Sequence, residues 1–139
     1  MIMMMTSTYK HIVHYYETDR MGITHHSNYI RWMEEARVYY LKEIGWGYDH
    51  LEEIGIMSPV TKVDCSYKHT TTFADEVSIH VSVEEFKGVR LKLKYMMYCK
   101  EQLVCEAYSE HCFLNKDGLP IRIKKEYPEF YEALVNEER

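Results

Sequence analysis

The chain has few of the features that mark fibrous, membrane-spanning or nucleic-acid-binding proteins. Only 6 glycines and 3 prolines occur in 139 residues, which excludes a collagen-like composition and gives no sign of a disordered chain. No apolar run approaches about 20 residues, the length of a membrane-spanning helix. Lys and Arg number 17 against 22 Asp and Glu, for a net charge of -5. No broad excess of positive charge is therefore available to bind nucleic acid.

Two further absences concern disulfides and targeting. The four cysteines have no C-x-x-C spacing and lie in strand-like runs, so we expect reduced core thiols; they are Cys65, Cys99, Cys105 and Cys112. The N-terminal MIMMMTSTYK has no charged region before a long apolar stretch and no cleavage signature. We expect one cytoplasmic domain spanning residues 1–139, a length at which a single core is large enough without disulfides.

What the chain does have is one long amphipathic helix. From Ser27 to Ile44 apolar residues recur at helical spacing. Ser27 or Asn28 is expected to cap its start. Gly45 suits the left-handed turn that often ends a helix.

Strand patterns stand on both sides of this helix. Before it, YKHIVHY at residues 9–15 predicts a strand with Tyr9, His11, Val13 and Tyr15 on one face. After it, apolar and polar residues alternate with period two, and FKGV at residues 86–89 reads as a hairpin turn around a glycine. The later strands are expected at 60–67, 77–84, 89–100 and 103–114, with a short helix at 128–134. One long helix against a mainly antiparallel sheet of about five strands is an α+β arrangement.

The segment YETDRMGITHHSNY, from Tyr16 to Tyr29, precedes the long helix and concentrates reactive side chains. Asp19 falls in this loop, and Gly22 would let the chain turn back toward the start of the helix. The unpaired backbone N–H groups there, near His26, can stabilise an oxyanion. A carboxylate beside such a site is a minimal acyl-transfer device that suits an activated acyl group such as a thioester. The alternative is an ordinary polar connection, because Asp and Gly are common loop residues.

The full pattern Y-x-T-D-x-x-G-x-x-x-H-x-x-Y, followed by WMEEAR at residues 32–37, resembles the hotdog-fold acyl-CoA thioesterases of the 4-hydroxybenzoyl-CoA thioesterase family. YKHTTTFADEV at residues 67–77 and NKDGLPIRI near the end fit the same family. The resemblance covers about residues 9–128. It implies a hotdog fold, in which an antiparallel sheet wraps a long central helix, and hydrolysis of acyl-CoA to free acid and CoA.

The resemblance also assigns roles residue by residue. It places the catalytic acid, as nucleophile or general base, on Asp19, and the loop glycine on Gly22. His26 takes the position whose backbone N–H contributes to the oxyanion site, and Tyr29 that of a pocket aromatic residue. His25 receives no role.

The family implies partners as well. Basic residues after the third strand bind CoA phosphates in family members, which gives Lys87 and, less closely matched, Arg90. CoA is part of the substrate, and no separate cofactor or metal is implied. A homodimer or homotetramer with the active site between protomers is implied, and neither nucleic acid nor a membrane span is expected.

Three alternatives remain beside this interpretation. A metal could bind among His11, His14, His25 and His26, although residues three apart on a strand face opposite sides. A non-catalytic acyl-CoA binder or a dehydratase could share the fold. A second hotdog lineage uses a helix glutamate with a His-Gly-Gly loop; that loop is absent, so Glu34 and Glu35 are expected to be surface or interface residues, with Glu34 pairing with Arg37.

Overall fold

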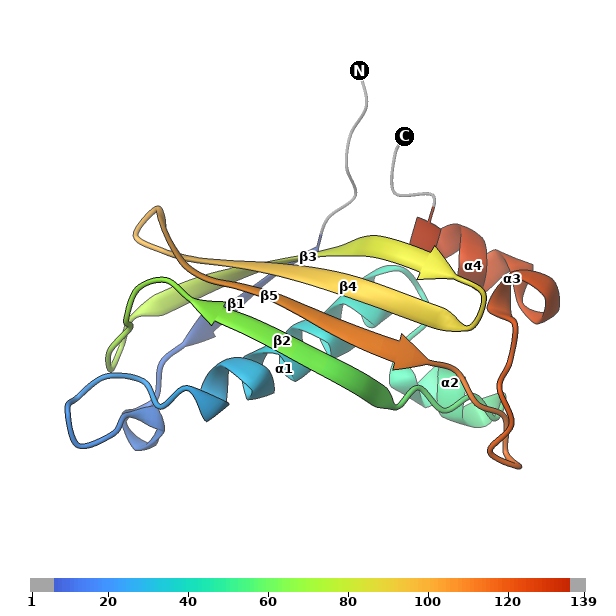
Figure 1. The fold of residues 1–139 in the computed structure, drawn as a ribbon, viewed down its shortest axis with the longest axis horizontal. Helices are drawn as coiled ribbons and strands as arrows, with labels where there is room; N and C mark the ends of the chain where they lie inside the picture. Colours follow the sequence, from blue (N-terminus) through green and yellow to red (C-terminus); the bar gives the residue numbers. More distant parts are fainter. Residues whose placement is uncertain (1–6, 136–139) are drawn as a thin grey trace, which may run out of the picture.

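The computed structural model describes residues 7–135 and shows an antiparallel sheet laid over a long helix (Figure 1). The sheet has five strands in the spatial order β1-β3-β4-β5-β2. Their bounds are Ser7–Ile12 (β1), Val60–Tyr67 (β2), Glu76–Lys87 (β3), Arg90–Cys99 (β4) and Gln102–Cys112 (β5). The helix α1, Ser27–Glu43, runs behind the sheet. The predicted α+β arrangement is confirmed.

A tight turn fixes the register between β3 and β4. Lys87 pairs with Arg90 across the β3–β4 turn, where Gly88 has a φ of 59° that favours glycine. This confirms the predicted hairpin. Within residues 7–135 the sheet ends at β1 on one side and at β2 on the other, so the outer edge of each of these strands pairs with no other described strand.

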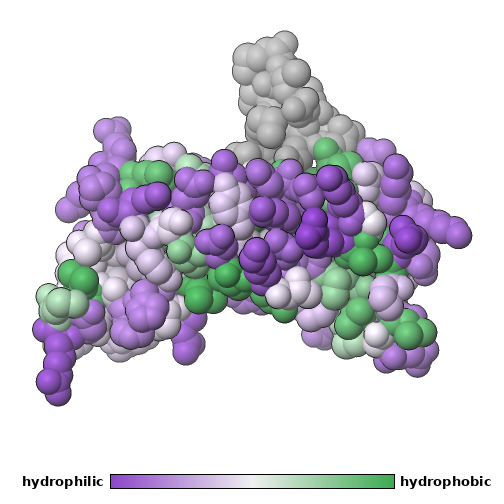
Figure 2. All heavy atoms as spheres, viewed as in Figure 1, coloured by the Kyte–Doolittle hydropathy of each residue, from purple (hydrophilic) through white to green (hydrophobic). Residues whose placement is uncertain are grey.

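The core lies between the inner face of the sheet and α1. Alternate residues of β4 point inward and are buried, whereas the residues between them are half-buried on the outer face. The side chains that α1 buries are Tyr29, Trp32, Met33, Ala36, Arg37, Tyr40 and Leu41. Figure 2 shows that the outer face of the sheet is mainly hydrophilic, with hydrophobic residues along its lower middle.

Four shorter helical segments complete the fold: a 3₁₀ turn at Tyr15–Glu17, α2 at Tyr48–Glu53, α3 at Ile123–Glu126 and α4 at Pro128–Val135. The α4 helix begins at proline, as predicted. We did not predict α2 or α3, because six and four residues are too few to reveal helical periodicity.

The first strand ends earlier than the pattern predicts. β1 stops at Ile12, and the His14 backbone N–H donates to Glu17 Oε1 at 2.8 Å. This bond draws the chain into the 3₁₀ turn, so Tyr15 lies off the strand face and is 76% exposed. The prediction that Tyr15 shares one strand face with His11 is therefore wrong.

The start of α1 also differs from the prediction. His26 is the N-cap residue, and neither Ser27 nor Asn28 caps the helix with its side chain. Ser27 Oγ pairs with His25 Nδ1, and Asn28 Nδ2 donates to the Glu17 carbonyl oxygen at 3.0 Å. These side chains join the helix to its loop instead. At the other end Gly45 has the expected positive φ, 89°.

The four cysteines are free thiols, as predicted. None of the helices within residues 7–135 has the length and apolar character to cross a membrane. The sequence prediction that no leader segment is present concerned residues 1–10. Residues 1–6 lie outside the described residues, which begin at Ser7.

Candidate active site

A tight loop positions Asp19 between β1 and α1. Thr18 and Thr24 form an antiparallel bridge at its base, and the Gly22 N–H donates to the Asp19 carbonyl oxygen at 2.9 Å. Gly22 has a φ of 81°, which gives it the backbone role expected. Asp19 Oδ1 accepts the Met21 N–H at 2.8 Å, while Oδ2 has no partner within residues 7–135. The loop thus orients the carboxylate and leaves one oxygen free for chemistry.

His26 supplies an unpaired donor at the start of α1. Its backbone N–H has no acceptor among the described residues, as expected for an N-cap position. Seventeen residues of helix follow, so the helix dipole adds partial positive charge at this N–H. His25 stacks on the His26 ring with centroids 4.4 Å apart, but its own N–H donates to the Glu17 carbonyl oxygen. The two adjacent histidines therefore differ, and only His26 offers a free backbone donor.

Asp19 and His26 line the same cavity, whose volume is about 330 Å³. Its other lining residues come from the loop, the first turns of α1 and the segment after β2: Met21, Ile23, Thr24, Tyr29, Tyr67, Lys68, His69 and Thr70. The sequence prediction brought together Asp19, Gly22, His26 and Tyr29. Asp19, His26 and Tyr29 line this cavity, Gly22 lies in the loop beside Asp19, and the structure adds Tyr67 with its neighbours.

Two tyrosines form the aromatic wall of the cavity, with ring centroids 5.1 Å apart. The Tyr29 hydroxyl lies 3.0 Å from Thr71 Oγ1, and the Tyr67 hydroxyl donates to the His26 carbonyl oxygen at 3.3 Å. Burial, aided by Cys65, raises the pKa of Tyr67 to about 12. Burial likewise raises the pKa of Tyr29. Both rings therefore stay neutral phenols that can donate hydrogen bonds at neutral pH.

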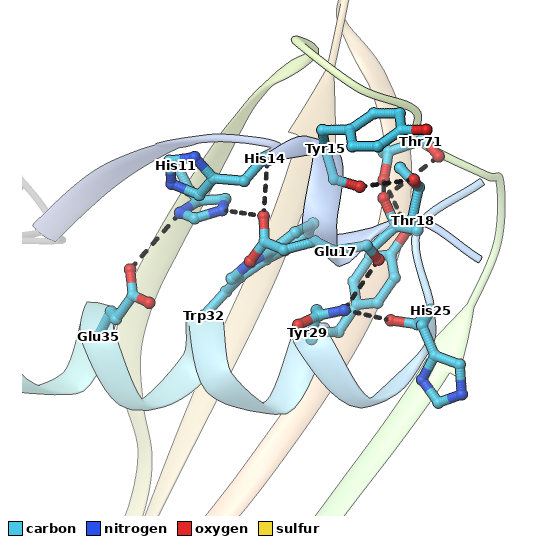
Figure 3. A network of polar contacts seen from close by, with 12 residues as sticks. His11, His14, Tyr15, Glu17, Thr18, His25, Tyr29, Trp32, Glu35 and Thr71 are labelled. Atoms are coloured by element: carbon cyan, nitrogen blue, oxygen red, sulfur yellow. Dashed lines mark hydrogen bonds and ion pairs between the residues drawn. The ribbon is translucent and has the colours of Figure 1, made fainter. Parts of the chain in front are cut away.

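Glu17 ties the loop to the core (Figure 3). Its carboxylate accepts from Trp32 Nε1 at 2.9 Å, from the His14 N–H at 2.8 Å, and lies 2.8 Å from His11 Nε2. Burial alone would raise the pKa of Glu17, but the hydrogen bonds outweigh it and lower that pKa below its ordinary value. The sequence prediction missed this residue, although an acid two positions before Asp19 was a visible signal.

The alternative of a metal site involves the same hydrogen-bond network around Glu17. Ligand atoms of His11, His14 and Glu17 lie within 4.8 Å of one another, because the chain leaves the strand at Ile12. The argument that strand geometry separates the two histidines was therefore wrong. However, both carboxylate oxygens of Glu17 already accept hydrogen bonds. A cation bound there would compete with the hydrogen bonds through which Glu17 holds the loop.

The residues predicted to bind CoA phosphates are not free cations. Arg90 contacts Glu85 at 3.2 Å and Glu110 at 3.5 Å. Lys87 lies 3.8 Å from Glu85. Both lie at the β3–β4 turn, at the opposite end of the sheet from the Asp19 loop in the same chain (Figure 1).

The helix glutamates lie outside the cavity. Glu34 pairs with the buried Arg37 at 2.9 Å, as predicted, and Glu35 accepts the Tyr9 hydroxyl at 2.8 Å. Both are exposed. Neither lines the Asp19 cavity, in agreement with the prediction of surface residues.

The sequence matches known proteins along nearly its whole length. Residues 13–134 match the model of the thioesterase-like superfamily. A putative acyl-CoA thioesterase, YneP, of Bacillus subtilis (strain 168) is 33% identical over 123 residues, covering 87% of this chain and 89% of that protein. A putative esterase of Aquifex aeolicus (strain VF5) is 33% identical over 118 residues, covering 85% of this chain and 91% of its own.

Solved structures agree with these sequence relatives. A DHNA-CoA thioesterase from Staphylococcus aureus superposes with a TM-score of 0.88 at 32% identity, covering 94% of this chain and 89% of its own. A gentisyl-coenzyme A thioesterase superposes with a TM-score of 0.82 at 26% identity, covering 92% and 99% of the two chains. These matches confirm the hotdog fold and the thioester hydrolase class of enzyme, whereas the 4-hydroxybenzoyl-CoA branch remains a prediction. The chain therefore belongs to the thioesterase-like superfamily.

Proposed function

We propose that the protein hydrolyses acyl-CoA thioesters to the free acid and CoA, with Asp19 as the catalytic acid residue. The observation that carries the proposal is that Asp19 and His26 line one cavity of about 330 Å³, and that the His26 N–H has no acceptor among the described residues. A carboxylate next to an oxyanion donor is the arrangement that hydrolysis of an activated acyl group requires.

The reaction needs two events at the acyl carbon. In the general-base route, water adds to the thioester carbonyl carbon while Asp19 Oδ2 takes its proton, and the carbonyl oxygen becomes an oxyanion at the His26 N–H. The C–S bond then breaks, and the thiolate leaves and takes up a proton. In the nucleophile route Asp19 Oδ2 attacks the carbonyl carbon first, the C–S bond breaks with release of the thiolate, and water then hydrolyses the resulting anhydride to the free acid and the Asp19 carboxylate. Both routes use the same two groups.

The acyl group is best sought first among aromatic acids. The relatives named for DHNA-CoA and gentisyl-CoA share 32% and 26% identity with this chain. Tyr29 and Tyr67 supply an aromatic wall that suits ring stacking. A panel of aromatic and aliphatic acyl-CoA substrates, assayed by release of free thiol, ranks them directly.

We also propose that two copies pair through β2. The outer edge of this strand pairs with no other strand in the described part of the chain, and Val60 and Val63 on it are 46% and 37% exposed. A free, partly apolar edge favours pairing with another strand. A two-fold pairing is antiparallel, so it would set the Val60 end of one β2 beside the Tyr67 end of the other, next to the Asp19 cavity.

The decisive experiment replaces Asp19 by asparagine. Asp19→Asn should fold normally and lower thiol release by about 10²- to 10⁴-fold, the usual contribution of a general acid or base. Asp117→Asn makes the same chemical change on an exposed turn and should leave the rate unchanged. Unaltered thiol release by Asp19→Asn would favour the alternative of an acyl-CoA binder or dehydratase.

A further inference from the structure

Three potential metal ligands lie together where β1 leaves the sheet. Ligand atoms of His11, His14 and Glu17 lie within 4.8 Å of one another, and the ring centroids of the two histidines are 5.4 Å apart. All three residues come from one short segment, because the 3₁₀ turn brings Glu17 back beside the end of the strand. None of them lines the Asp19 cavity, and the proposed hydrolysis gives none of them a chemical step.

The donor set of this cluster suits a divalent transition metal. Two imidazoles and one carboxylate are ligands that zinc accepts in tetrahedral sites. Bonds of about 2.1 Å to a tetrahedral ion put neighbouring ligand atoms about 3.4 Å apart. His11 Nε2 and Glu17 Oε1 lie 2.8 Å apart, so they would separate by about 0.6 Å to admit zinc. The His14 side chain is exposed and has room to move toward the ion.

A cation competes directly with only one of the hydrogen bonds of Glu17. Oε1 contacts His11 Nε2 and also accepts the His14 backbone N–H at 2.8 Å, whereas Oε2 accepts Trp32 Nε1 at 2.9 Å. Each carboxylate oxygen has two lone pairs. An ion between Glu17 and His11 would therefore replace the contact between these two side chains, and the other two bonds could still hold the loop.

A second carboxylate orients His11 for binding an ion (Figure 3). Glu35 Oε1 lies 3.5 Å from His11 Nδ1 and also accepts the Tyr9 hydroxyl at 2.8 Å. A metal-binding histidine commonly donates its other ring N–H to a carboxylate, which fixes the tautomer and the orientation of the ring. With the proton on Nδ1, facing Glu35, His11 Nε2 has a lone pair directed toward Glu17.

The burial of the cluster favours an ion further. His11 and Glu17 are only 7% and 5% exposed. Within residues 7–135, Glu17 forms no ion pair with lysine or arginine. Buried charges in proteins are usually paired or coordinate metals. The exposed His14 lies at the solvent side of the cluster, so an ion can enter without crossing the core.

We propose that His11, His14 and Glu17 bind one Zn²⁺ ion through His11 Nε2, a ring nitrogen of His14 and Glu17 Oε1, with Glu35 positioning His11. Water would take the fourth position. Because the ion would join the end of β1 to the loop that carries Asp19, its binding should stabilise the folded chain. The inference goes beyond the proposed function, and its test needs no substrate.

The test is calorimetric titration of the full chain with zinc chloride, for which we expect one ion per chain. His14→Ala removes an exposed ligand and should weaken zinc binding by about 100-fold. Glu35→Gln, which keeps an acceptor for Tyr9, should weaken it by about tenfold. Zinc should raise the Tm of the unchanged protein but not that of His14→Ala. With Co²⁺ in place of zinc, the unchanged protein should show the strong visible absorption of a four-coordinate ion, and His14→Ala should not.

Matched controls change the same residue types elsewhere on the surface. His50→Ala on α2 and Glu43→Gln on α1 alter exposed side chains and should leave the zinc affinity unchanged. Failure of the unchanged protein to bind zinc, or equal affinity in His14→Ala, would overturn the inference. An equal loss in His50→Ala would overturn it in favour of non-specific binding. A loss in His25→Ala as large as that in His14→Ala would also overturn it, because the ion would then lie at the two adjacent histidines before α1.

Discussion

Trp32 Nε1 donates a 2.9 Å hydrogen bond to Glu17 Oε2, joining the middle of α1 to the loop that carries Asp19. The Glu17 backbone takes part as well, because its carbonyl oxygen accepts the His25 N–H at 2.9 Å. One buried residue thus holds both the strand side and the helix side of the candidate active site. The position of Asp19 relative to the helix start depends on this link.

Replacing Glu17 by glutamine should destabilise the fold by about 1–3 kcal/mol at neutral pH, the cost of losing hydrogen bonds to a buried charged group. Because the pKa of Glu17 is lowered in the folded state, its contribution is complete above the ordinary carboxyl pKa. It is lost as the pH falls through the lowered value. Urea unfolding at several pH values should therefore show the difference between Glu17→Gln and the unchanged protein shrinking in acid. Glu35→Gln, on a more exposed carboxylate, should cost less at every pH.

Replacing His26 by alanine should reduce activity far less than Asp19→Asn does. The backbone N–H, which is the group we assign to the oxyanion, survives this substitution, and removal of an oxyanion donor costs about 10²- to 10³-fold only when the donor itself is lost. Steady-state kcat for thiol release measures the effect, with His25→Ala as the neighbouring control. A loss as large as that of Asp19→Asn would show that the imidazole itself takes part.

Replacing Val63 by lysine should prevent pairing through β2, because each interface would then carry two like charges along the paired edges. Sedimentation should give a monomer mass, and thiol release should fall with it if the active site lies between protomers. Val38→Lys is a matched control, since Val38 has the same 37% exposure but lies on α1. A fully active Val63→Lys monomer would contradict both the pairing and the shared site.

His111 should make the fold sensitive to acid. Burial, reinforced by the charge of Arg37, lowers the pKa of His111 to about 3, and its Nε2 lies 2.6 Å from Ser109 Oγ. The unfolded chain binds a proton at an ordinary pKa near 6.5, so stability is lost as the pH falls from about 6.5 toward about 3. Protonation of this one residue can change the free energy of unfolding by at most about 1.4 kcal/mol per pH unit. His111→Gln should flatten the stability profile in this window, whereas the same change at exposed His14 should not.

Several features of the fold could be predicted because they depend on local spacing. The helix near 27–44 and the strand at Val60–Tyr67 each span enough residues for periodicity to show. Gly22 and Gly45 were identified because a positive φ suits glycine. The α2 and α3 helices are too short to show helical periodicity in the sequence. β1 ends early because the His14 N–H donates to the side chain of Glu17, three residues further along the chain.

The sequence by itself determined the order of elements and the presence of Asp19, Gly22 and His26 in one loop before a helix. Only the tertiary structure decided which charged and polar groups find a hydrogen-bond or ion-pair partner. Pairing of Arg90 with Glu110 across 20 residues and the hydrogen bond of Tyr67 to the helix start both depend on strand register and loop packing. These contacts join residues far apart in the chain, and local spacing carries no information about whether a charge finds its partner.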